Sequence, residues 1–320
     1  MADMRTNLAW FQLPNPILTA SGCAASGKEL SQFFDLTDLG AMVTKSIMLR
    51  PRSGRATPRM AETPSGMLNS IGLQGPGIDE FIKNDLAWLQ KQGSRVVVSI
   101  AGTHTDEFVE VARKLKGHQA VSMLEVNISC PNVESRGQVF ACDAIASSRV
   151  IGAVRRVADP AQPVFAKLSP DVTDITLIAR ACADAGADGF SLINTLLGLV
   201  IDPDTMAPAL GGVTGGLSGP AIRPVALRCV WQVRQAIPHL PILGMGGIRT
   251  GLDALQFLLA GASAVSVGTA VFGDPNAPMR ILRELEQALD ERGLLSVSDA
   301  IGRAHRAPVP RLDATSVGAS

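Results

Sequence analysis

The sequence predicts a (β/α)8 TIM barrel that forms a single domain with long βα loops. Short apolar runs rich in β-branched residues recur along the 320 residues, and an amphipathic segment follows most of them. Strands that read as continuous apolar runs are typical of a parallel sheet covered on both faces. The segments "AGADGF" and "AGASAV" join a helical pattern to the next strand. Eight such units are the number that a barrel requires.

The expected strands are Ile17–Ala20, Ala41–Thr44, Val96–Ile100, Met123–Ile128, Val164–Leu168, Gly189–Ile193, Ile242–Met245 and Ala264–Val267. The expected helices are Ile78–Gln90, Asp106–Lys116, Ile145–Val157, Ile175–Ala185, Ala221–Ala236, Leu252–Ala260 and a closing Ala277–Arg292. A doubly wound sheet is the structural alternative. It would normally carry a Gly-rich turn after its first strand, and "ASGCAASG" matches G-x-G-x-x-G poorly.

Two connections between expected elements are long, residues 46–77 and 194–220. Long loops that follow barrel strands are usually functional. We expect the catalytic barrel to occupy residues 1–302 without an internal boundary and residues 303–320 to form a disordered tail.

Composition excludes few function classes but favours a cytoplasmic protein. Lys plus Arg and Asp plus Glu number 29 each, so nothing supports a nucleic-acid or membrane surface. Aromatic residues make up 4% with no Tyr, which argues against base-stacking platforms. The five Cys are dispersed without a CxxC, which indicates reduced thiols and no metal site. The N-terminus has no apolar signal core.

Polar residues and glycines gather at the predicted carboxyl ends of the strands, where barrels place their chemistry. Gly246 and Gly247 follow the seventh strand, and Gly268 and Thr269 follow the eighth. Glycine-rich turns that lead into helices expose backbone N–H groups to an anion. These two turns therefore predict a phosphate site.

Lys45 and Lys167 end two strands of an otherwise apolar barrel. A buried lysine is costly without a partner, and no Asp or Glu ends a neighbouring strand, so the expected partner is a bound anion. Four asparagines fall near the same mouth and offer uncharged donors and acceptors, which suit a planar substrate with carbonyl, N–H and carboxylate groups. They are Asn69, Asn127, Asn132 and Asn194.

The segment "EVNISCPN" places a thiol, Cys130, at the end of the fourth strand. Pro131 cannot extend a central strand, so Cys130 leaves the sheet at the active mouth. A thiol there can act as a nucleophile or as a general base. Because a free thiol has a pKa of about 8.5, a Cys base predicts a rate that rises with pH.

These residues resemble class 1 dihydroorotate dehydrogenase from Asn15 to Gly273. The resemblance rests on "NPILTASG", "GAMVTKSIMLRPRSG", "GMLNSIGLQGPG", "EVNISCPNV", "AKLSPDVTDI", "LINTLLGLVID", "GGLSGPAIRPVALRCVWQVR", "PILGMGGI" and "AGASAVSVGTAVF". The sixth and seventh segments resemble the NAD-linked branch, class 1B. Two features differ from the family: Ser99 stands where Asn is expected, and "ESRGQVFACD" alters the lid region that follows Cys130.

The resemblance implies FMN at the barrel mouth, with Cys130 as the base. The implied FMN contacts are Ser21, Lys45, Ser46, Ser99, Asn127, Lys167, Ile193, Gly219, Gly246, Gly247, Gly268 and Thr269. The implied orotate contacts are Lys45, Asn69, Ser70, Ile71, Gly72, Leu73, Asn127, Asn132, Asn194 and Thr195. It further implies no metal on this chain, a homodimer, and a partner subunit that carries FAD and a [2Fe–2S] cluster and reduces NAD⁺.

Several other functions remain open at this stage. The nearest are a stand-alone class 1A enzyme that uses fumarate and the catalytic subunit of a dihydropyrimidine dehydrogenase. A dihydrouridine synthase would need a basic RNA-binding face, which the charge balance does not favour. A flavin-binding scaffold without catalysis is the last alternative.

Overall fold

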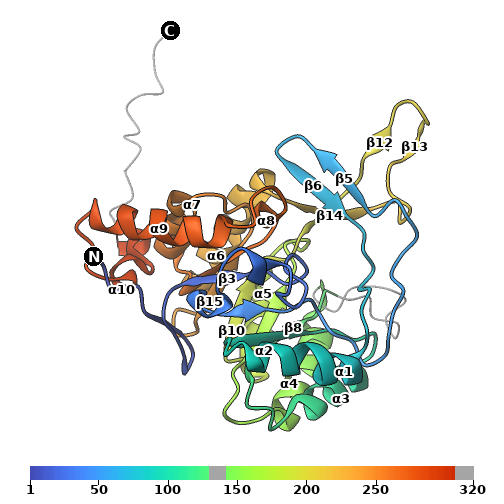
Figure 1. The fold of residues 1–320 in the computed structure, drawn as a ribbon, viewed down its shortest axis with the longest axis horizontal. Coiled ribbons are helices and arrows are strands. Elements are labelled where there is room, and N and C mark those ends of the chain that lie inside the picture. The colour runs from blue at the N-terminus through green and yellow to red at the C-terminus, as the bar shows by residue number, and fades with distance from the viewer. Residues whose placement is uncertain (130–141, 307–320) are drawn as a thin grey trace.

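Eight parallel strands close into a ring in the computed structural model, which describes residues 1–129 and 142–306 (Figure 1). The strands are β3 (Ile17–Thr19), β4 (Met42–Val43), β7 (Val96–Ile100), β8 (Val121–Asn127), β9 (Val164–Leu168), β10 (Gly189–Leu192), β15 (Ile242–Met245) and β16 (Ala264–Val267). Their order is β3-β16-β15-β10-β9-β8-β7-β4, and a parallel bridge from Leu18 to Ala41 joins the two ends. The predicted barrel is confirmed, and closure rules out the doubly wound sheet.

Helices surround the strands, with α1 to α4 grouped along one side of Figure 1 and α6 to α9 along another. They are α1 (Ile78–Glu80), a π-helix (Phe81–Leu86), α2 (Ala87–Lys91), α3 (Thr105–Leu115), α4 (Ala144–Val157), α5 (Ile175–Asp184), α6 (Arg223–Ala236), α7 (Gly251–Ala260), α8 (Ala270–Gly273), α9 (Ala277–Asp290) and α10 (Val297–Ala300). Within the described ranges, none has the length and apolar character needed to cross a membrane.

The helical segments differ from the sequence expectation in two places, and two 3-10 turns, Leu30–Gln32 and Leu36–Asp38, lie between β3 and β4, where no helix was expected. The expected helix from Ile78 contains the π-helical segment. The helix expected from Ala221 begins at Arg223, after a 3-10 turn over Pro220–Ile222. Pro224 explains that start, because proline lacks a backbone N–H and is tolerated in the first turn of a helix.

An N-terminal hairpin of β1 (Thr6–Leu8) and β2 (Phe11–Leu13) contributes apolar side chains to the barrel interior. Leu8 and Leu13 are buried in one cluster with Leu18, Val97 and Phe165. A second, larger cluster packs the outer faces of the strands against the helices. The interior formed by the described strands is therefore a packed core.

The two long loops pair with each other in a small antiparallel sheet, here called the loop sheet, which projects from the barrel in Figure 1. Its strands are β11 (Leu196–Gly198), β14 (Gly215–Ser218), β6 (Gly66–Asn69) and β5 (Met60–Thr63), in that order. A two-stranded hairpin of β12 (Ile201–Asp202) and β13 (Ala207–Pro208) extends from the second loop. The loops predicted to be functional are thus held in one fixed arrangement.

The sequence prediction places the start of the disordered tail too early, at residue 303. Arg303–Arg306 forms a 3-10 helix, and the ring of His305 stacks on Trp231 of α6 at 3.6 Å between centroids. His305 Nε2 also lies 2.9 Å from the Ala260 carbonyl oxygen. Aromatic stacking and this polar contact fix residues 303–306, while residues 307–320 lie outside the described ranges.

Gly189 offers a test of the barrel interior, because a Cβ at this position would lie 2.3 Å from Cζ of the buried Phe165 ring. We expect Gly189→Ala to lower the free energy of unfolding by about 1–3 kcal/mol, the usual cost of overpacking a core. Urea denaturation measures the change. In the control Gly152→Ala on α4, the nearest atom is 3.5 Å away, so stability should stay unchanged or rise by up to ~1 kcal/mol. Equal effects of the two substitutions would contradict the tight interior.

Candidate active site

A cavity of about 2030 Å³ opens at the carboxyl ends of the barrel strands and continues against the loop sheet. Apart from Ser99, every residue predicted to contact the cofactor lines this cavity. The predicted substrate contacts line it as well, except Asn132, which lies outside the described residues together with Cys130. Strand ends that are far apart in sequence are therefore gathered round one space.

Ser99 is placed differently from the prediction. It is fully buried on β7, and its Oγ lies 2.9 Å from Oγ of Ser46, which lines the cavity. The shorter side chain of serine thus ends behind Ser46. Ser99 therefore orients Ser46 through this hydrogen bond and does not itself line the cavity.

A chain of hydrogen bonds crosses the barrel mouth and fixes its amide groups. Asn127 Nδ2 donates to Ser46 Oγ at 3.0 Å, and Asn194 Nδ2 donates to Asn127 Oδ1 at 3.2 Å. The backbone N–H groups of Ser129 and Thr195 donate to Asn127 Oδ1 and Asn194 Oδ1, at 3.2 and 2.8 Å. Each amide oxygen is an acceptor here, so the side chains have a defined orientation before any ligand binds.

Asp171, which the sequence reasoning missed, ties the loop sheet to the barrel. Its carboxylate lines the cavity, accepts from the Leu197 N–H at 3.2 Å and accepts from Ser169 Oγ at 3.3 Å. The segment "AKLSPDV" could have identified Asp171 as a site residue, because it places a carboxylate shortly after the end of the fifth strand. It holds the start of β11 beside the substrate end of the cavity.

Two glycine turns form the opposite end of the cavity. Gly246 and Gly247 have φ values of 130° and 76°, and a Cβ on Gly247 would lie 2.7 Å from the Gly219 carbonyl oxygen. Within the described residues, the backbone N–H groups of Gly246, Gly247, Gly268 and Thr269 donate no hydrogen bond to protein. Unpaired N–H groups that face a cavity are suited to an anion such as phosphate. The α7 N-terminus does not contribute, because its first N–H groups are capped by Thr250, Asp253 and Glu284.

The two lysines line the same cavity but differ in their surroundings. Burial lowers the pKa of the Lys45 ammonium group from its ordinary value of 10.5. Lys167 Nζ donates to Ser21 Oγ at 2.7 Å, and its side chain is 5% exposed. Both lysines thus line the cavity together with the glycine turns and the asparagines.

The expectation that a bound anion is the partner of both lysines does not hold for Lys167, which has a carboxylate beside it. Glu125 on β8 is fully buried, and its Oε1 lies 3.5 Å from Lys167 Nζ. The prediction considered only residues at strand ends, whereas Glu125 lies two residues before Asn127 on the same face of β8. The charged residue within the otherwise apolar segment "MLEVNI" could have indicated this buried carboxylate.

Cys23 is a second thiol at the cavity. Burial raises the pKa of the Cys23 thiol to about 11, although Lys167 and Lys45 act in the opposite direction. The thiol therefore stays protonated at neutral pH and is a poor base there. Among the described residues, no group of three or more His, Cys, Asp or Glu side chains gathers at a possible metal site.

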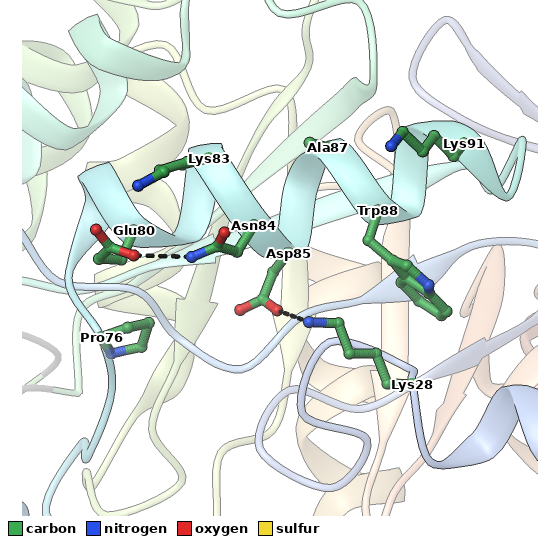
Figure 2. A pocket seen from close by; sticks show the side chains of 9 residues that line it. All are labelled: Lys28, Pro76, Glu80, Lys83, Asn84, Asp85, Ala87, Trp88 and Lys91. Atoms are coloured by element: carbon green, nitrogen blue, oxygen red, sulfur yellow. Dashed lines mark hydrogen bonds and ion pairs between the residues drawn. The ribbon is translucent and has the colours of Figure 1, made fainter.

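A second hollow, of about 670 Å³, lies on the outer surface of the segment from Glu80 to Lys91 (Figure 2). Two polar pairs lie in it: Lys28 Nζ donates to Asp85 at 2.6 Å, and Asn84 Nδ2 donates to Glu80 at 2.7 Å. Lys28 also lies 5.9 Å from the Trp88 ring centroid. None of the predicted site residues lines this hollow, so the barrel mouth remains the candidate site.

Comparison with known families decides the family to which the chain belongs. A model of the family described as "Dihydroorotate dehydrogenase" matches residues 3–289. The chain belongs to this family. The resemblance predicted from Asn15 to Gly273 is confirmed, and the match extends beyond both ends. Membership makes the chain an oxidoreductase that acts on dihydroorotate.

Curated relatives are similar over nearly the whole chain. The protein of Geobacter sp. (strain M21) is 51% identical over 300 residues, which cover 94% of this chain and 97% of the relative. The protein of Desulforudis audaxviator is 49% identical over 299 residues, covering 93% and 96%. Both relatives carry the name "Dihydroorotate dehydrogenase B (NAD(+)), catalytic subunit".

Gly247→Ala tests the glycine turn as an anion site. The added Cβ would meet the Gly219 carbonyl and the Arg223 side chain, so the turn must shift and its N–H groups must turn away. We expect FMN affinity, measured by fluorescence titration of the apoprotein, to fall at least about tenfold, since each good charge-assisted hydrogen bond contributes roughly 1.5–3 kcal/mol. The control Gly117→Ala has a similar φ, 80°, but open space around the Cβ. Equal FMN affinity in the two variants would contradict the assignment.

Proposed function

We propose that the chain is the catalytic subunit of an NAD-linked, class 1B dihydroorotate dehydrogenase. It oxidises (S)-dihydroorotate to orotate, a step of de novo pyrimidine synthesis, with FMN as its resident cofactor. The observation that carries the proposal is the single cavity lined by eleven of the twelve predicted cofactor residues in a chain of this family.

The residues present fit FMN. The glycine turns offer unpaired N–H groups to its phosphate, and a Cβ on Gly246 or Gly247 would collide with neighbouring atoms. Lys167, Ser21, Ser46 and Asn127 would hold the ring system at the other end of the cavity. When bound, FMN supplies the acceptor for the hydride that leaves C6 of dihydroorotate.

The substrate side suits a small cyclic imide with a carboxylate. Asn69, Asn127 and Asn194 present amide donors and acceptors, and Lys45 supplies a positive charge. Asn69 Nδ2 also donates to the Gly216 carbonyl at 3.2 Å, which orients this amide from the loop sheet. We propose that these groups bind orotate together with Ser70, Ile71, Gly72, Leu73, Thr195 and Asn132.

Cys130 is the proposed general base. It follows Ser129, which lines the cavity at the end of β8. From there the thiolate takes the proton from C5 of dihydroorotate. The apolar barrel core beneath the cavity limits access of water from that side, which strengthens electrostatic interactions at the site.

The names of the relatives support a proposal for the electron acceptor and the partner subunit. Both are called catalytic subunits and NAD(+) enzymes, which supports a partner subunit here. We propose that this partner carries FAD and a [2Fe–2S] cluster and passes electrons to NAD⁺. We further propose a homodimer of this chain as the core of a cytoplasmic heterotetramer.

Cys130→Ser tests the base. The hydroxyl is far less acidic than the thiol, so turnover should fall roughly 10²–10⁴-fold, the usual scale for loss of a general base. Turnover of dihydroorotate with a dye acceptor gives the rate, and the visible spectrum gives the flavin content, which should stay unchanged. Cys229→Ser, which alters a buried thiol on α6 that does not line the cavity, is the control and should retain wild-type turnover. Wild-type turnover in Cys130→Ser would exclude Cys130 as the base.

The acceptor assay separates the proposed class from its alternatives. We expect the purified chain alone to turn over poorly with fumarate, and the chain with an FAD/[2Fe–2S] subunit from the same operon to reduce NAD⁺. Rapid fumarate-dependent turnover without a partner would assign class 1A instead. Reduction of uracil, with no oxidation of dihydroorotate, would assign a dihydropyrimidine dehydrogenase.

A further inference from the structure

Glu125 is a carboxylate sealed inside the barrel. It is fully buried on β8, and neither of its oxygens makes a hydrogen bond within the described residues. It does not line the cavity, whereas Asn127, two residues further along the same face of β8, does. Glu125 therefore lies one layer below the mouth, in the interior of the barrel.

Lys167 is the cationic group closest to this carboxylate. Its Nζ lies 3.5 Å from Glu125 Oε1 and donates to Ser21 Oγ at 2.7 Å. An ammonium group has three donors, so a further N–H remains for the cavity that Lys167 lines. The lysine thus has a carboxylate beneath it and the proposed cofactor site above it.

Stability alone does not account for this pair. Burying both charges removes them from water, and the loss of hydration often equals or exceeds their mutual attraction. The contact of 3.5 Å is also longer than a good charge-assisted hydrogen bond. An apolar pair of similar size would stabilise the barrel at least as well, so stability does not explain why these charged residues are here.

The geometry points to an effect on the cofactor, and the inference rests on the proposed function. We propose that Glu125 is a positioning residue that acts on the flavin through Lys167. It would hold the ammonium group at the cofactor site and offset part of its charge, so that the reduced state of a bound flavin would be stabilised less strongly.

The direction of the effect follows from charge. A reduced flavin gains negative charge near the ring nitrogens, and an ammonium group beside it stabilises that state. A carboxylate on the far side of the ammonium weakens the stabilisation, most strongly in a low-dielectric interior. Removing the carboxylate charge should therefore raise the reduction potential of the bound flavin.

Glu125→Gln keeps the size of the side chain and removes its charge. We expect the ratio of affinities for reduced and oxidised FMN to rise about tenfold, equivalent to ~30 mV for a two-electron couple. Reductive titration against a reference dye measures the midpoint potential directly. Ser191→Ala is the matched control, because Ser191 is equally buried, has no hydrogen bond within the described residues and lies beside Lys167 in the sheet register. It should leave the potential unchanged.

A second background tests whether the effect passes through the lysine. In Lys167→Met, the further change Glu125→Gln should shift the potential much less than in the wild-type chain. If Glu125→Gln does not fold, Glu125→Asp replaces it, since the shorter side chain draws the carboxylate away from Nζ and should give a smaller upward shift.

Outcomes for the two proposals are distinct. A wild-type chain that binds no flavin would overturn the proposed function and this inference with it. A wild-type flavoprotein whose potential is unaffected by Glu125→Gln, or by Glu125→Asp where that variant replaces it, would overturn the inference alone. An equal shift in Ser191→Ala, or a full shift in the Lys167→Met background, would also overturn it.

Discussion

Closure of eight parallel strands into a ring is the constraint on which the site depends. Because the strands are parallel, their carboxyl ends all meet at one mouth, whatever their separation in the sequence. Asn127 and Lys167 are neighbours because β8 pairs with β9, whereas Ser21, which follows β3, meets Lys167 inside the ring that the bridge from Leu18 to Ala41 closes. The packed interior of Leu18, Val97 and Phe165 then supports the mouth from below.

The mouth is held rigid by polar contacts as well as by packing. The chain from Ser99 through Ser46 and Asn127 to Asn194 links side chains from different strands, so each amide is oriented by the next. The loop sheet adds a second support, because β6 and β14 come from different long loops and pair with each other. Preorganised groups of this kind cost little reorganisation when a ligand binds.

Much of this arrangement could be predicted from the sequence, because each strand end is visible as a change from an apolar run to polar residues. Apolar runs located all eight strands, and the polar residues after them located the cavity. The positions of Ser99 and Glu125 relative to the cavity were harder to predict, because the depth of a side chain below the mouth depends on strand register and strand tilt. The pairing of the two long loops was not predictable either, since it joins residues such as Asn69 and Gly216 that are remote in the sequence. The stacking of His305 on Trp231 is likewise a tertiary contact that no local sequence pattern predicts.

The central claim is that one mouth holds both the flavin and the substrate in contact. Anaerobic addition of dihydroorotate to the flavin-loaded chain, without any partner subunit, tests it most directly. Bleaching of the flavin absorbance, with one orotate formed for each flavin reduced, is the predicted result. A flavin that stays oxidised in the presence of saturating dihydroorotate, or an apoprotein that takes up no flavin, would contradict it.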